Sequence, residues 1–494
     1  MDNHKCVSDL VEQTVITDAY KISNIFRHLN EDSVARGKIN KEKVKLRSVH
    51  YSYRKFWMLR ISIIFFKFIG LATFAHRIVT QRKRRLCTFQ YSEIGMVYNS
   101  LLISLIIASN FLSIPYTMNM EYENRSNLTV GIEILQNILG SVVICAILLN
   151  YCIDQKSLVR IANRLMDIEH EIDCLYRLYS PLRRQRVFFT LFIVCFLKSF
   201  LLIALLITEF LAFHSSPVSW LTDILPTFHV GWLMVQYFLL VTVIQADFAD
   251  VNRAIQSLSG TPDLYSQSVY RTRRVVVSNS TVYQLLKLRD AHSHLCEISE
   301  NISEFFSMPI LFGITFFFLT LIYNGYYLLS PLLMSDEVLE YKIFSNTVFW
   351  LIFLIYPVCL LTNRITKISN EIGKTGNVVH DLLSCAVGKK AEAELKQFSL
   401  QLLHRNIRFT VNGYFSLDNS FLHSVRIFRN NIRSNASSSN ANFIIFFIFY
   451  PSDYQLIGTV ATYLVILVQF QMGSKGSFSK PHCNCTREDL SNKE

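Results

Sequence analysis

The sequence predicts an all-α protein that crosses a membrane seven times, and three observations lead to this fold class. The chain is 51% hydrophobic and only 17% charged, whereas soluble domains carry about 25% charged residues. Apolar windows of membrane-spanning length recur along the chain, and Lys and Arg alternate between the connecting loops. The net charge of +12 is typical of the cytosolic loops of a polytopic protein. Because no basic stretch accompanies a nucleic-acid-binding module, we expect no nucleic-acid partner.

The individual elements follow from windows of about 20 apolar residues, the length that crosses roughly 30 Å of hydrocarbon. Residues 1–55 are polar and lack the apolar core of a signal peptide, so they form a cytosolic N-terminal segment. Residues 56–75 are apolar but contain Arg60 and Lys67, which are costly at mid-bilayer. We therefore expect an interfacial or re-entrant helix that is followed, to residue 93, by a basic linker.

Six clear spans then lie within 94–363, at 94–114, 130–152, 188–212, 225–247, 305–330 and 344–363, and an interrupted seventh ends at residue 471.

The orientation follows from the Lys and Arg content of the connections. The loops predicted outside hold two such residues, and the three loops predicted inside hold twenty-one. Positive loops stay in the cytosol, so the N terminus is cytosolic and seven crossings leave the C terminus outside. Two glycosylation triplets, beginning at Asn124 and Asn127, fall in the first outer loop. Such triplets are also common by chance.

The predicted inner loops contain helices. Between residues 153 and 186, apolar residues recur every three or four positions: Leu158, Ile161, Leu165, Ile168 and Ile172. Residues 281–304 and 391–408 behave similarly, which predicts helices that extend into the cytosol and pack against one another. Residues 258–280 are rich in Ser and turn residues, which predicts a loop.

The end of the chain resembles a known family. TYLVILVQF at 462–470 matches the TY, five apolar residues, QF signature that closes insect gustatory receptors. FSLQLLHRNIRFTVNGYFSLDNSFLHS at 398–424 resembles the segment that leads into their last helix. The resemblance covers the chain from about residue 57 to 472.

The resemblance implies a fold and an activity. It implies a homotetramer, or a heteromer with other gustatory receptors, that forms a ligand-gated channel for cations. It also implies a multi-pass location in the plasma membrane of chemosensory dendrites, in contact with membrane lipid. A small-molecule tastant would bind a pocket in the outer half of each subunit, residues 364–424 would form cytosolic anchor helices, and no cofactor is implied.

The seventh helix, residues 456–471, would line the pore. On one face of a helix lie Thr462, Ile466 and Gln469, flanked by Tyr463 and Phe470. Four copies of Gln469 would form an amide ring near the outer mouth, and Ile466 would close the pore by dewetting. The alternative is that Gln469 only caps the helix at the interface and Tyr463 joins an aromatic belt. Asp418, beside Asn419 at the inner start of a membrane helix, is expected to cap free N–H groups and to complement the helix dipole. The alternative is that it attracts cations at the inner mouth of the pore.

The sequence departs from the family between Val425 and Leu456. In place of a short join stand about 30 residues, which include an Asn/Ser tract at 430–442. A polar tract of this kind belongs in solvent and not within a membrane. Removal of 425–455 would leave a helix of spanning length, so we interpret this atypical insertion as a translated intron. Residues 472–494 would be an extracellular tail.

Polar and aromatic groups in the outer halves of three spans are candidates for the ligand pocket. They are His229, Trp232, Gln236, Tyr323, Asn324, Tyr326, Tyr327, Asn346, Thr347 and Trp350. The alternative is that Tyr and Trp here form interfacial belts and that His229 is a packing residue. Lys198 and Glu209 are ionisable residues inside the third span and are functional candidates, although Lys198 could also snorkel to the interface.

Other classes of function fit less well. A seven-helix G-protein-coupled chemoreceptor is the alternative, but it needs the N terminus outside, against the Lys/Arg count. A secondary transporter should show internal repeats with broken helices, and none is apparent. The sequence holds no Walker-type loop and no zinc-ligand spacing, so we expect neither an enzyme nor a metal site.

Overall fold

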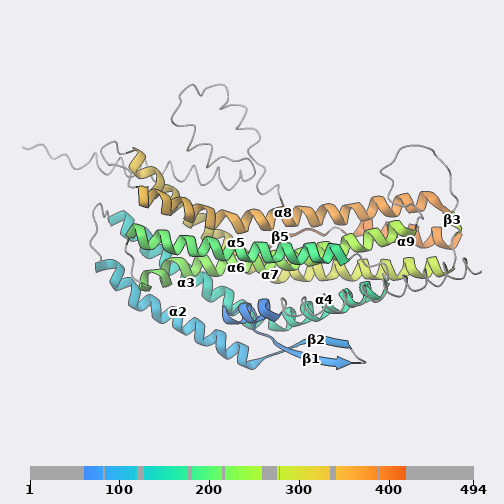
Figure 1. Ribbon diagram of the computed structural model, residues 1–494, viewed down its shortest axis with the longest axis horizontal. Helices are drawn as coiled ribbons and strands as arrows, with labels where there is room; N and C mark the ends of the chain where they lie inside the picture. Colours follow the sequence, from blue (N-terminus) through green and yellow to red (C-terminus); the bar gives the residue numbers. More distant parts are fainter. Residues whose placement is uncertain are drawn as a thin grey trace, which may run out of the picture. The chain divides into compact units, whose positions relative to one another are not determined.

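The computed structural model describes residues 60–81, 84–119, 127–175, 181–213, 217–258, 275–276, 279–333, 341–387, 389–405 and 407–418. The chain divides into two units, Met1–Phe66 and Lys67–Glu494. In the first unit, residues 60–66 are helical. All the labelled elements belong to the second unit (Figure 1).

The second unit is mostly helical, as the sequence predicts. Its helices are α2 (Glu93–Asn119), α3 (Asn127–Ile153), α4 (Gln155–Leu175), α5 (Pro181–Phe213), α6 (Pro217–Leu258), α7 (Asn279–Leu333), α8 (Tyr341–Cys385) and α9 (Lys389–His404). Six of them, α2, α3, α5, α6, α7 and α8, are long and apolar enough to cross a membrane. They contain the six clear spans expected from the sequence, which confirms that part of the prediction. The seventh span lies outside the described residues.

Helix α6 is the centre of the bundle. It packs against α8, α7 and α3, and Figure 1 shows α5, α6, α7 and α8 side by side. In the apolar window of α6, 78% of residues are buried, against 17% in α2 and 22% in α5. The exposed residues of α5 are large and apolar, among them Phe192, Phe196 and Phe200. Such a surface is suited to lipid rather than to water.

Three helices are much longer than a bilayer is thick. Helix α7 has 55 residues, α8 has 45 and α6 has 42. At 1.5 Å per residue these are about 82, 68 and 63 Å long, against roughly 30 Å of hydrocarbon. The polar half of α7 contacts α4 and α9. The predicted helical body beside the membrane is therefore built from continuations of the spanning helices.

Helix α4 confirms the predicted apolar stripe. Leu158, Ile161, Ile168 and Ile172 are all at most 4% exposed, and Leu165 is half-buried. Arg164 of α4 forms an ion pair with Glu297 of α7. The stripe buries one face of α4, and this pair joins its charged side to α7.

Two antiparallel strands occupy most of the segment before residue 93 that the sequence predicted to be a basic linker. Strands β1 (Ala75–Gln81) and β2 (Arg84–Gln90) pair with Ile78 opposite Cys87 and Val79 opposite Leu86. The β-branched and aromatic content of both segments explains the pairing.

Two short strand pairs complete the second unit. Strand β3 (Val275–Val276), within the predicted loop 258–280, pairs in parallel with β4 (Ala386–Val387) between α8 and α9. Strands β5 (Thr410–Val411) and β6 (Phe415–Ser416) form a hairpin. Its turn contains Asn412 and Gly413, both with positive φ, the residue types that adopt this conformation most readily.

A buried non-helical strap, residues 69–74, runs among α2, α3 and α6. Leu71 and Thr73 are at most 2% exposed. Gly70 has a φ of 81°, and a Cβ there would lie 2.7 Å from Leu148 Cδ2, so only glycine suits this position. Of the segment 56–75, for which the sequence predicts an interfacial or a re-entrant helix, residues 60–68 are helical and residues 69–74 form this strap.

The strap is stable because side chains satisfy its backbone. Asn99 donates to the Gly70 carbonyl at 2.9 Å, Gln236 to Leu71 at 3.0 Å and Gln155 to Thr73 at 2.6 Å. Just before the strap, the Tyr98 hydroxyl donates to the Phe68 carbonyl at 2.6 Å. A buried carbonyl without a donor costs about 1–3 kcal/mol. Irregular backbone at membrane depth is tolerated only where the protein supplies such partners.

Candidate ligand site

Glu209, near the C-terminal end of α5, is hydrogen-bonded to the N-terminal part of α8. Its Oε2 accepts hydrogen bonds from Asn346 Nδ2 at 2.7 Å and from Trp350 Nε1 at 3.1 Å. Thr208, the neighbour of Glu209, donates to Asn346 Oδ1 at 2.9 Å. Two of the predicted pocket residues, Asn346 and Trp350, thus meet the carboxylate that the sequence flagged separately. We refer to these four residues as the Glu209 cluster.

The Glu209 cluster combines an acidic group, amide and hydroxyl groups and an indole ring. Asn346 and Trp350 are 3% and 7% exposed. Aromatic faces next to a few fixed polar groups are the usual lining of small-molecule sites. Thr208 was not predicted from the sequence. Its position next to an ionisable residue on a spanning helix is the feature from which it could have been predicted.

Tyr323 of α7 contacts a second acidic residue. Its hydroxyl donates to Glu133 Oε1 of α3 at 3.1 Å. Glu133 was not predicted as a candidate, although a carboxylate inside the second predicted span meets the same criterion as Glu209. The two carboxylates lie on different helices and contact different candidate residues.

Gln236 has a structural partner on each side. Its Oε1 accepts from the Tyr151 hydroxyl at 2.8 Å, and its Nε2 donates to the Leu71 carbonyl of the strap. Both atoms of the amide are therefore occupied. The contacts explain Gln236 by the folding of the strap, without a ligand.

The other candidates on α6 and α7 lie in the packed interior. His229 and Trp232 are 5% and 4% exposed, and Tyr326 is 4% exposed. Within the described residues, His229 Nε2 has no hydrogen-bond partner. Trp232 packs edge-on against Phe228, with ring centroids 6.2 Å apart. The assignment of His229 to the pocket, or to packing alone, therefore stays a prediction.

Two more candidates bond to their own helices. Asn324 donates to the Thr320 carbonyl at 2.8 Å, and Thr347 to the Ile343 carbonyl at 3.0 Å. Tyr327 lies in α7, where its side chain is not among those described. The structure thus brings Asn346 and Trp350 together and leaves the remaining candidates dispersed over three helices.

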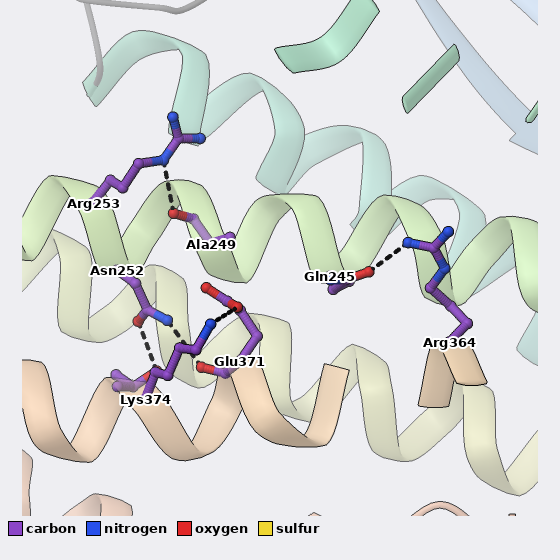
Figure 2. A network of polar contacts seen from close by, with 8 residues as sticks. Gln245, Ala249, Asn252, Arg253, Arg364, Glu371 and Lys374 are labelled. Carbon is purple, nitrogen blue, oxygen red and sulfur yellow. Dashed lines mark hydrogen bonds and ion pairs between the residues drawn. The ribbon is translucent and has the colours of Figure 1, made fainter. Parts of the chain in front are cut away.

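The C-terminal parts of α6 and α8 are joined by a separate polar network (Figure 2). Asn252 donates to the Glu371 carbonyl at 2.9 Å and accepts from the Thr375 hydroxyl at 2.7 Å. Arg364 donates to Gln245 Oε1 at 2.8 Å and lies over the Phe238 ring. These bonds fix the C-terminal half of α8 on α6.

The remaining predicted sites are described in part or not at all. Asn127 is the first residue of α3 and Asp418 follows β6 in a bend. Asn124, the pore residues Thr462, Tyr463, Ile466, Gln469 and Phe470, and residues 425–494 lie outside the described residues. Within the described ranges, no group of three His, Cys, Asp or Glu residues is placed to hold a metal ion.

These features define a multi-pass helical membrane protein with polar residues gathered inside its bundle. The family model described as "7tm Chemosensory receptor" matches residues 59–427, and the chain belongs to this family. The family consists of receptors and not of enzymes.

Similarity to individual proteins is more limited. The chain is 27% identical over 192 residues to "Putative gustatory receptor 28b" of Drosophila melanogaster. The matched region covers 37% of this chain and 34% of that protein. The chain is 26% identical over 153 residues to "Putative gustatory receptor 28a" of the same species, or 30% of this chain and 34% of that protein. The chain thus spans about a third of the length of these relatives.

Among solved structures, the insect olfactory receptor OR5 from Machilis hrabei is similar, with a TM-score of 0.49 and 14% sequence identity. The match covers 85% of this chain and 99% of that one. The structure of the same receptor in complex with eugenol matches with a TM-score of 0.47 and 13% identity, over the same shares of the two chains.

Proposed function

We propose that this chain is a gustatory receptor that forms a cation channel opened by a small-molecule tastant. The observation that carries the proposal is the match of residues 59–427 to the chemosensory receptor family. The regional similarity to two putative gustatory receptors favours taste over other chemical senses. The TY–QF ending at 462–470 supports the same choice.

The proposed assembly is a tetramer, either of identical subunits or with other gustatory receptors, in the plasma membrane. The seventh helix of each subunit lines the pore, with Gln469 and Ile466 facing the axis. Cations pass along this axis, and the inner halves of α7 and α8 with α9 anchor the subunits. The large apolar residues exposed on α5 would face lipid.

The Glu209 cluster is the proposed contact site for the tastant. Its residues sit at the ends of α5 and α8 that the Lys/Arg count assigns to the outside. A ligand that hydrogen-bonds Asn346 or stacks on Trp350 would compete with the bonds between Glu209 and α8. Binding energy would thereby be coupled to the contact between the two helices.

Recording from cells without other insect chemoreceptors tests the channel proposal. We would express the full chain, and in parallel the chain without residues 425–455, and apply a panel of sugars, alkaloids and amino acids. A ligand-evoked cation current that persists when GDPβS blocks G proteins is the expected result. A response that disappears with GDPβS would instead identify a G-protein-coupled receptor.

Staining of terminal tags separates the same two proposals without a ligand. In unpermeabilised cells we expect the C-terminal tag to be accessible and the N-terminal tag to be protected. The reverse pattern would contradict the orientation on which the pore assignment depends.

A further inference from the structure

Helix α8 contains a proline in its middle. Pro357 lies inside the helix and has no backbone N–H, so it cannot donate to the carbonyl four residues before it. That carbonyl belongs to Phe353, whose side chain is fully buried. Without another donor, a buried polar group would be left unsatisfied in an apolar bundle.

Lys198 of α5 supplies the missing donor. Its Nζ donates to the Phe353 carbonyl oxygen at 3.1 Å, and the same atom lies 3.3 Å from the centroid of the Phe353 ring. Lys198 is fully buried. The alternative that its side chain snorkels to the interface is therefore wrong, because an acceptor inside the bundle is available.

Helix α6 leaves the space that this lysine occupies. A Cβ at Gly231 would lie 2.7 Å from Lys198 Nζ and 2.9 Å from its Cε. Any larger residue at this position would displace the end of the lysine. Three helices thus contribute one residue each to a single arrangement: a donor on α5, a gap on α6 and a break in the hydrogen-bond ladder of α8.

The break separates two differently attached parts of α8. On one side, Asn346 and Trp350 contact Glu209; on the other, Arg364 and Thr375 are bound to α6. We propose that Lys198 is a positioning residue that replaces the absent N–H of Pro357, so that the part of α8 bearing Asn346 and Trp350 keeps its direction relative to the inner part. This inference does not depend on the identity of the tastant.

A double-mutant cycle tests the proposal. Lys198→Met keeps the length and apolar volume of the side chain and removes the donor, whereas Pro357→Ala restores the backbone N–H. In purified full-length protein in detergent, we expect Lys198→Met to speed amide exchange at residues 358–361 by about tenfold, the effect of losing one buried hydrogen bond. In the Pro357→Ala background, the same substitution should change this exchange by less than about twofold.

A matched control separates loss of the donor from loss of packing. Val194 is one helical turn before Lys198 on α5 and is 4% exposed, so Val194→Ala removes buried methyl groups but no hydrogen bond. Its effect should be equal in the wild-type and the Pro357→Ala backgrounds. If Lys198→Met is equally harmful in both backgrounds, as Val194→Ala is expected to be, the proposal is wrong.

Gly231→Ala offers a second route to the same result. The added methyl group should push Lys198 from the Phe353 carbonyl and raise exchange at the same amides, again less so in the Pro357→Ala background. If Lys198→Met does not fold, recovery of a monodisperse species in the Lys198→Met, Pro357→Ala protein supports the proposal. Failure of that double variant to fold, while Pro357→Ala alone folds, overturns it.

Discussion

Tyr151 of α3 and Gln236 of α6 are joined by a hydrogen bond of 2.8 Å between their side chains. The same glutamine amide donates to the Leu71 carbonyl, so the pair connects two spanning helices to the strap. Tyr151 is also buried, with its ring edge-on to Phe305 of α7. This contact links three helices to a buried stretch of irregular backbone.

Replacement of Gln236 should test how far the fold depends on this link. We expect Gln236→Leu to lower the free energy of unfolding by about 2–4 kcal/mol, because both the Leu71 carbonyl and the Tyr151 hydroxyl lose their partners. Tyr151→Phe, which leaves the strap bond intact, should cost about 1 kcal/mol. Thermal loss of the monodisperse peak in detergent measures the destabilisation of both variants. Equal destabilisation by Gln236→Leu and Tyr151→Phe would mean that the bond to the strap contributes little.

Gly70 should tolerate no side chain. Gly70→Ala places a Cβ at a φ of 81° and 2.7 Å from Leu148 Cδ2, so we expect a loss of about 1–2 kcal/mol or more. Gly376→Ala is the control, since a Cβ there meets nothing within 4 Å. In the interior of α8 it should stabilise by about 0.5–1 kcal/mol. Equal shifts of the thermal midpoint would contradict the role assigned to Gly70.

Arg289 should hold α9 on α7. It contacts Glu394 at 3.0 Å and Gln397 at 3.1 Å, and its side chain is only 20% exposed. We expect Arg289→Met to increase amide exchange across α9 by roughly threefold to tenfold, the effect of losing a partly buried, charge-assisted bond. Lys396→Met breaks the ion pair with Glu392 on the exposed side of α9, in which the two side chains are 62% and 47% exposed. Exposed pairs contribute little, so exchange should stay nearly unchanged in that variant.

Substitution within the Glu209 cluster should affect the response to ligand. Asn346→Leu removes the bonds to Glu209 and Thr208 and should shift the half-maximal concentration of the most effective tastant by about tenfold. Lys342→Ala, on the exposed first turn of α8, is the control. A dose–response series measures the shift, and equal curves for both variants would remove the cluster from the proposed site.

The stretch 425–455 should be absent from the mature transcript. The family match ends at residue 427, inside this stretch, and the Asn/Ser tract is incompatible with a membrane span. Amplification and sequencing of cDNA across these codons provides the measurement. A transcript that contains them would refute the interpretation as an intron.

The local patterns of the sequence predicted much of this fold. The length of the apolar segments located all six described spans. The spacing of Leu158, Ile161 and Ile168 predicted the buried face of α4. These features depend on neighbours within a few turns of the same helix. The strand pair formed by 75–81 and 84–90 was not predicted, because the basic residues between and within the strands are typical of a linker and obscure the β-propensity of their neighbours.

The contacts within the candidate site depend on distant residues and could not be predicted in this way. Gln236 pairs with a carbonyl 165 positions away, and Lys198 with one 155 positions away. No periodicity connects such positions. The carboxylate of Glu209 was recognisable from the sequence as unusual, but its partners on α8 became apparent only from the packing of the helices.

The strap also constrains the order of events on the ribosome. Its Leu71 carbonyl depends on an amide that is synthesised 165 residues later, a delay of roughly 10 to 30 s at typical elongation rates. During this interval the Leu71 carbonyl lacks its Gln236 donor, although the Asn99 donor for the Gly70 carbonyl is synthesised only 29 residues after it. Docking of the strap against α6 must therefore be a late step of biogenesis, and substitutions at its partners should reduce delivery to the cell surface before they alter any signal.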